Sequence, residues 1–327
     1  MKTYLEHILY ICIGTILLVS CGSASKSIKS ARTALSRGEY EVAAEHFKKA
    51  YKRISPKDKK MRGEIAFEMG NTYTAYGNVA RALAAFKNAE RYKYNDTLVY
   101  PQLGMLSMQL GNYKEAANYF AKHLELVDDN TSKLRYNWAL RASDFKQQSS
   151  AYTVKLEKLF ASSRSDYSPM FANSEGNELY FTSTRNQATG DELSGITGMK
   201  NSDLFCVRKD EKGKWKAPEL VEGGLNTPLD EGACCFSTDG KMYLTVCPTD
   251  PEYPRMAEIW TSNRSDAKWN KASKLKITED TLSSYAHPCL SPDGTWLYFV
   301  SDMPGGYGGT DLWRAKLEGS EIGLVEN

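Results

Sequence analysis

The chain has 327 residues, 25% of them charged, and a net charge of +2 at pH 7. This length allows two domains of ordinary size. The near-neutral balance, with no dense basic cluster, gives no indication of nucleic-acid binding. Charge is nevertheless uneven: residues 22–150 carry 22 Lys/Arg and 13 Asp/Glu, whereas residues 151–327 carry 19 and 26. A basic half that faces an acidic partner and an ordinary lysine-rich helix surface both fit this asymmetry.

The N-terminus predicts a signal peptide over residues 1–20. Lys2 precedes an apolar run from Ile8 to Val19, which is shorter than the roughly 20 residues that cross a bilayer. The run ends in Leu18-Val19-Ser20-Cys21-Gly22, which resembles a bacterial lipobox. The resemblance implies lipidation of Cys21, with residues 21–30 as a lipidated tether. An ordinary signal peptide with an incidental cysteine is the alternative.

A repeated pattern of small and aromatic residues predicts a helical array over residues 31–146. Two copies lie 34 residues apart: Gly77, Val79, Ala82, Phe86 and Ala89, then Gly111, Tyr113, Ala116, Phe120 and His123. An earlier copy begins at Gly38. The period resembles that of the tetratricopeptide repeat, in which three or more hairpins stack to bury their apolar faces. A last helix, from about Lys133 to Phe145, is expected to cap this α-solenoid.

The tetratricopeptide resemblance implies a concave groove that binds segments of other proteins. By repeat position, the expected groove residues are Phe67, Asn71, Thr74, Met105, Met108 and Arg135. Phe67 and the two methionines would form an apolar stripe for a ligand. Ordinary packing within the array is the alternative for all six.

After residue 153 the apolar pattern changes toward the alternation of β-strands. Three copies of a strand–turn–strand motif follow, with turns at Glu175-Gly176, Asp239-Gly240 and Asp293-Gly294. Glycine suits these turns because it adopts positive φ without strain. The copies resemble TolB-like, WD-related propeller blades, which implies an incomplete β-propeller of about three blades over residues 153–327. Because a propeller closes into a ring, we expect the chain to be the front part of a longer protein.

The order of lipobox, tetratricopeptide repeats and blades resembles the N-terminal part of Bacteroidetes envelope lipoproteins of the PorE type, in the OmpA family. The resemblance implies a non-enzymatic scaffold on the periplasmic face of the outer membrane, held by the lipid on Cys21. Its helices and propeller would bind envelope proteins in a type IX secretion or gliding complex. Peptidoglycan binding in that family belongs to a C-terminal domain to which no residue here corresponds. A truncated periplasmic peptidase and a SusD-like glycan-capture lipoprotein are the alternatives.

The sequence predicts no catalytic residues, no metal site and no cofactor. Its four histidines include no His-x-x-x-His pair, and it lacks a nucleophile elbow and a phosphate-binding loop. After Cys12 and Cys21, an odd number of cysteines remains, with no Cys-x-x-Cys spacing: Cys206, Cys234, Cys235, Cys247 and Cys289. Buried free thiols are expected, and one disulfide is the alternative.

Overall fold

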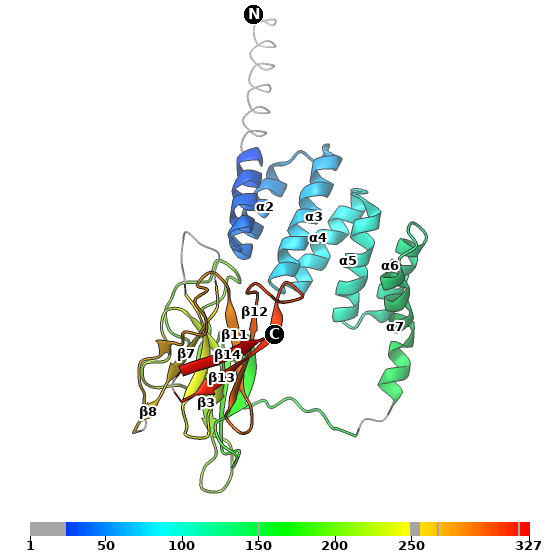
Figure 1. Ribbon diagram of the computed structural model, residues 1–327. Coiled ribbons are helices and arrows are strands. Elements are labelled where there is room, and N and C mark those ends of the chain that lie inside the picture. Colours follow the sequence, from blue (N-terminus) through cyan, green and yellow to red (C-terminus); the bar gives the residue numbers. More distant parts are fainter. Residues whose placement is uncertain (1–23, 149–150, 249–255, 267, 320) are drawn as a thin grey trace, which may run out of the picture. The chain divides into compact units, whose positions relative to one another are not determined.

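The computed structural model describes residues 24–148, 151–248, 256–266, 268–319 and 321–327 (Figure 1). The expected signal peptide and Cys21 lie outside the described residues. The chain divides into a helical unit, which runs to Thr153 and includes Gly195–Gly198, and a β unit of Val154–Ser194 and Met199–Asn327. Within the described residues, no helix combines the length and apolar character needed to cross a membrane.

The helical unit is a row of antiparallel helices in which each helix packs against the next. In the described residues it contains a helix over 24–36, followed by α2 (Tyr40–Arg53), α3 (Lys59–Ala75), α4 (Val79–Arg91), α5 (Asp96–Gln109), α6 (Tyr113–Leu124) and α7 (Asn130–Gln147) (Figure 1). The expected tether is wrong for residues 24–30, which are helical. Ala24 and Ala31 of this helix are buried with Phe47 and Ile65, so its apolar face joins the core.

Polar caps and glycines define the hairpins. The side chains of Asp58 and Asp129 accept hydrogen bonds from the backbone nitrogens of Met61 (3.0 Å) and Ser132 (2.8 Å), which satisfies free donors at the starts of α3 and α7. Gly77 and Gly111 end their first helices with φ of 77° and 74°, a conformation in which glycine carries no Cβ penalty. The 34-residue spacing of the sequence is therefore the spacing of the hairpin turns.

Close approach inside each hairpin depends on a glycine that faces a phenylalanine. A methyl group placed on Gly70 or Gly104 would lie 2.7 Å from the ring of Phe86 or Phe120, respectively. Both rings are completely buried. The helices can therefore approach only because these two positions lack a side chain.

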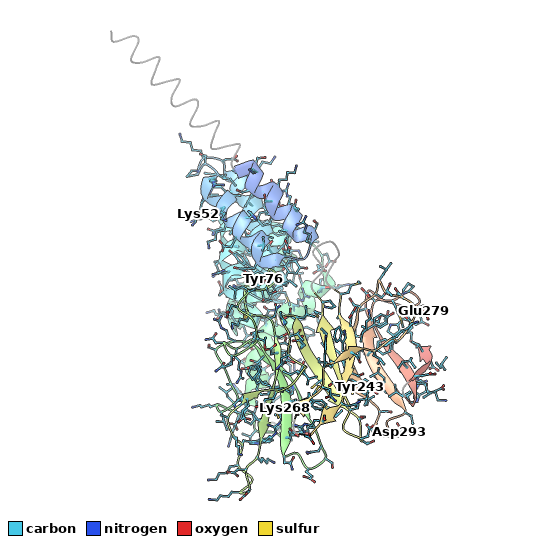
Figure 2. All side chains as sticks on the ribbon, turned by 90° about the vertical axis from the view of Figure 1, so that its left-hand side faces the viewer. Lys52, Tyr76, Tyr243, Lys268, Glu279 and Asp293 are labelled. Carbon is cyan, nitrogen blue, oxygen red and sulfur yellow. The ribbon has the colours of Figure 1, made fainter. Side chains whose placement is uncertain are left out.

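The β unit contains three four-stranded antiparallel sheets. The first is β1 (Asp166–Phe171), β2 (Glu178–Ser183), β3 (Asp203–Arg208) and β4 (Glu219–Leu220); the second is β5 (Asp230–Phe236), β6 (Met242–Cys247), β7 (Glu258–Ser262) and β10 (Ser273–Lys274); the third is β11 (Tyr285–Leu290), β12 (Trp296–Ser301), β13 (Asp311–Glu318) and β14 (Glu321–Glu326). A short ribbon of β8 (Arg264–Ser265) and β9 (Lys268–Trp269) follows β7. The three expected turns join the first two strands of each sheet, and Figure 2 labels Asp293 in the third turn. The sequence did not predict β14.

Apolar side chains fill the space between neighbouring sheets. Tyr180, Leu204 and Leu244 belong to a buried cluster shared by the first and second sheets, and Ile259 and Phe299 to a cluster shared by the second and third. In the part of the β unit that the structure describes, the sheets do not close into a ring. The fold is thus helical repeats followed by a β-sheet unit, and the propeller stays a prediction.

Replacing Gly104 by alanine is expected to lower the free energy of unfolding of the helical unit. Alanine favours an isolated helix by about 1 kcal/mol over glycine, but overpacking against a buried ring costs about 1–3 kcal/mol. Urea unfolding followed by circular dichroism at 222 nm measures the difference. Gln109→Ala, at an exposed position of the same helix, is the control; equal stability of both variants would contradict the packing argument.

Candidate functional site

The first helices of successive hairpins present the face expected to bind partners. On α3 the side chains of Asn71 and Thr74 are exposed. The hydroxyl of Thr74 donates to the Gly70 carbonyl oxygen at 2.9 Å, a hydrogen bond within α3. Both side chains are thus accessible, and their role in a binding groove stays a prediction.

The apolar members of the expected groove pack inside the array. Phe67 contacts the rings of Phe86 and Tyr94, with centroids 5.5 and 5.0 Å apart. Met105 and Met108 pack with the cluster around Phe120 instead. The structure therefore places Phe67 and the methionines in two different clusters rather than in one stripe. Arg135 is half-buried on α7, and a binding role for these four residues stays a prediction.

The sequence did not predict a charged network that joins the helix over 24–36 to α3. The Arg32 guanidinium donates to both carboxylate oxygens of Glu68, at 2.5 and 3.2 Å, and lies 3.4 Å from Glu64. The hydrogen bond and charge of Glu68 raise the pKa of Arg32. Glu64 and Glu68 are four residues apart on α3, a spacing that places both on one face. That spacing was the available signal, but their partner on another helix became visible only in the folded chain.

In the β unit, one carboxylate binds two guanidinium groups. Glu178 on β2 accepts from Arg208 on β3 at 2.9 Å and from Arg264 on β8 at 3.0 and 3.4 Å. Arg264 also donates to the Tyr180 hydroxyl at 3.1 Å, and Trp269 donates to that oxygen at 3.2 Å. Burial disfavours the charge on Glu178, but Arg264 and Arg208 outweigh it, so its pKa lies below the ordinary value.

Arg208, Arg264 and Trp269 also line a cavity of about 380 Å³. Its other lining residues include Glu219, Glu222 and Asp266. The cavity therefore combines two arginines with an acidic rim, and this mixed charge favours no single ionic ligand. The network fixes the first sheet to the β8–β9 ribbon, which is a structural role.

A second polar cluster contains two buried acids. Asp203 begins β3 and Glu231 lies in β5; their exposed fractions are 0% and 1%. Burial, followed by the nearby charges of Asp203 and Asp230, raises the pKa of Glu231 to about 8 although the backbone and hydroxyl of Thr227 donate to it. Burial also raises the pKa of Asp203, whose Oδ1 has no hydrogen-bond partner. These surroundings therefore favour the protonated form of Glu231 at neutral pH.

The described residues contain no group of three His, Cys, Asp or Glu placed to hold a metal ion. His287 lies in β11 with φ of 54°, and its backbone nitrogen donates to the Thr245 hydroxyl at 2.9 Å. The five remaining cysteines, all among the described residues, form no disulfide; three are buried, Cys247 is half-buried, and Cys289 is exposed. The expectation of buried thiols is thus wrong for Cys289.

Comparison with known proteins supports the repeats. Residues 102–134, from α5 to the start of α7, match the family model of the tetratricopeptide repeat. No curated protein matches the sequence. The family match and the hairpin geometry agree on the helical unit, and neither extends to the β unit.

Three solved structures resemble parts of the chain. The tetratricopeptide domain of Sgt2 from Aspergillus fumigatus is 17% identical, with 43% of this chain and 91% of that chain covered and a TM-score of 0.33. A protein of unknown function from Dyadobacter fermentans is 16% identical, with 49% of this chain and 50% of that chain covered and a TM-score of 0.33. A thermostable family-43 glycoside hydrolase is 15% identical, with 52% of this chain and 60% of that chain covered and a TM-score of 0.35. The matches thus span about half of the second protein and three fifths of the third. At these scores, similarity carries no argument about function.

Replacing Glu231 by glutamine is expected to flatten the pH dependence of stability. In the unfolded chain its pKa is near 4.3, whereas in the folded chain it is about 8. Between these values the folded state binds the extra proton, so the free energy of unfolding falls as pH rises, by at most about 1.4 kcal/mol per pH unit. Above the pKa of about 8 in the folded chain, Glu231 is ionised in both states, and this contribution to the free energy of unfolding is fully lost.

Urea unfolding from pH 5 to pH 9, followed by tryptophan fluorescence, measures this slope. The glutamine variant should lose less stability across the window than the wild type. Glu211→Gln, at an exposed position, is the control and should keep the wild-type slope. Identical slopes for wild type and Glu231→Gln would show that Glu231 is ionised throughout.

Proposed function

We propose that this protein is a non-enzymatic scaffold that binds other proteins through its helical repeats. The observation that carries the proposal is the array of stacked hairpins from α3 to α6, part of which matches the tetratricopeptide family. Arrays of this kind present extended surfaces that bind proteins, and the fold is typically non-enzymatic. The exposed Asn71 and Thr74 mark the accessible part of the proposed groove.

The proposed location is the periplasmic face of the outer membrane. Support comes from the apolar run and from the lipobox-like sequence that ends at Cys21. Acylation there would hold the protein at the membrane, because more than one lipid chain gives stable anchoring. A place in a type IX secretion or gliding complex, with envelope proteins as partners, follows from the PorE-type resemblance. This assignment is part of the proposal.

The β unit is proposed to be part of a propeller that supplies a second binding surface. Support comes from its three similar antiparallel sheets and from the equivalent bulges in their first strands, where Ser168, Ala233 and His287 adopt positive φ. Repetition of a rare backbone conformation at one strand position is typical of a repeated structural unit. Ring closure requires further sheets.

Replacing Cys21 by alanine is expected to release the protein from the membrane fraction, because the thiol that accepts the lipid is lost. Cell fractionation followed by immunoblotting measures the distribution. Cys12→Ala, within the same leader, should remain in the membrane fraction. Retention of the Cys21→Ala protein with the outer membrane would refute lipid anchoring and leave the proposed protein binding untouched.

Introducing arginines at Asn71 and Thr74 is expected to reduce partner binding, because two bulky cations would fill the accessible part of the groove. Mild crosslinking in the native envelope, followed by affinity purification and mass spectrometry, compares the variant with wild type. Ala84→Arg, at an exposed position of α4, is the control. If both variants capture the same proteins in equal amounts, the groove at α3 is not the binding surface.

A further inference from the structure

Helix α7 exposes a stripe of large apolar side chains. Leu134, Trp138 and Phe145 are 48%, 48% and 52% exposed. Their spacing places them on one face of the helix, together with Arg141, whose guanidinium lies 5.5 Å from the centroid of the Phe145 ring. The terminal helix of an array needs a polar outer face for solubility. The prediction that α7 is a simple cap is therefore incomplete.

The stripe occupies the side of α7 on which a second helix packs in the earlier hairpins. Trp138 lies 34 residues after Gly104, the glycine that receives the Phe120 ring. An indole at this position fills the space that the phenylalanine of a further hairpin would need. The stripe consequently cannot accept another helix of the same type, and it fits a partner that presents a small residue to Trp138.

We propose that the α7 stripe packs against the α7 stripe of a second copy of this chain, with the two helices antiparallel. The midpoint of the pair would lie between Ala139 and Leu140. Leu134 and Phe145 are equally distant from this midpoint, so each would face the other across a two-fold axis. Every contact in such an isologous pair occurs twice.

The remaining contacts of this pairing are also complementary. Trp138 and Arg141 are also equally distant from the midpoint, so the indole would lie against the Arg141 side chain of the other copy, with Ala142 next to it on the same flank. On the other flank, Lys133 of one helix would lie near Asp144 of the other. Both side chains are about half exposed or more, at 49% and 60%. In the single chain Lys133 is paired with Asp128 and Asp144 with Arg141, and such exposed pairs exchange at little cost.

The association is expected to be weak. Three half-exposed apolar side chains per copy cover well under the roughly 800 Å² per partner of a standard stable interface. The aromatic anchors would provide most of the affinity, because Trp and other aromatics dominate small interfaces. This self-association does not depend on the proposed scaffold function, although a shared lipid anchor would raise the local concentration of the copies.

Analytical ultracentrifugation of residues 22–327 tests the proposal, from low micromolar to several hundred micromolar protein. The wild type should show a concentration-dependent dimer. Trp138→Ala should lower the association constant by about tenfold or more. Leu98→Ala removes a similarly exposed leucine from α5 (46% exposed) and should leave association unchanged. Circular dichroism at 222 nm verifies that each variant is folded.

Charge reversal tests the orientation of the helices. Lys133→Asp and Asp144→Lys should each weaken the dimer, and the double variant should restore it, because opposite charges again face each other. A wild type that stays monomeric at every concentration would overturn the proposal. So would a dimer that Trp138→Ala leaves unchanged, which would indicate association elsewhere, such as through an open strand edge. Failure of the double variant to restore association would exclude the antiparallel register.

Discussion

The contact between a glycine and a buried phenylalanine ring determines how the helical unit is built. Gly70 and Gly104 allow the rings of Phe86 and Phe120 to lie where a Cβ atom would otherwise be. Once a hairpin is this narrow, its remaining apolar surface can be covered only by the next hairpin, so the helices stack in a row. On α7 the equivalent position is Trp138, whose side chain prevents another helix from packing in the same way. An apolar surface therefore stays exposed on α7.

The β unit relies on a repeated joint between sheets. Ala233 in β5 and His287 in β11 adopt positive φ and donate through their backbone nitrogens to the hydroxyls of Thr182 and Thr245 in the preceding sheet, at 3.0 and 2.9 Å. A non-glycine residue in this conformation carries strain, which the hydrogen bond and the surrounding apolar cores offset. The joint thus fixes one sheet against the next without covalent links.

Polar groups distinguish the two units. In the helical unit the Arg32 network lies at the surface, where ion pairs contribute little to stability. In the β unit, Glu178 is mostly buried and remains ionised because two arginines bind it. Burial and the nearby charges of Asp203 and Asp230 instead raise the pKa of Glu231 above its ordinary value. The same residue type is therefore charged at one sheet junction and favours the protonated form at another, and this difference makes the stability of the β unit sensitive to pH.

The sequence by itself determined the repeats, because the Gly77-to-Gly111 spacing and the Asp239-Gly240 turn are local patterns with local physical causes. By repeat position it also assigned Asn71 and Thr74 to one face of a helix, since a helical period specifies which face a residue occupies; their role in binding stays a prediction. Only the tertiary structure decided that Phe67 packs against Phe86 and Tyr94, and that Arg264 reaches Glu178 from 86 residues away. Periodicity specifies a face but not its neighbour; burial and charge pairing depend on which distant elements the fold brings together.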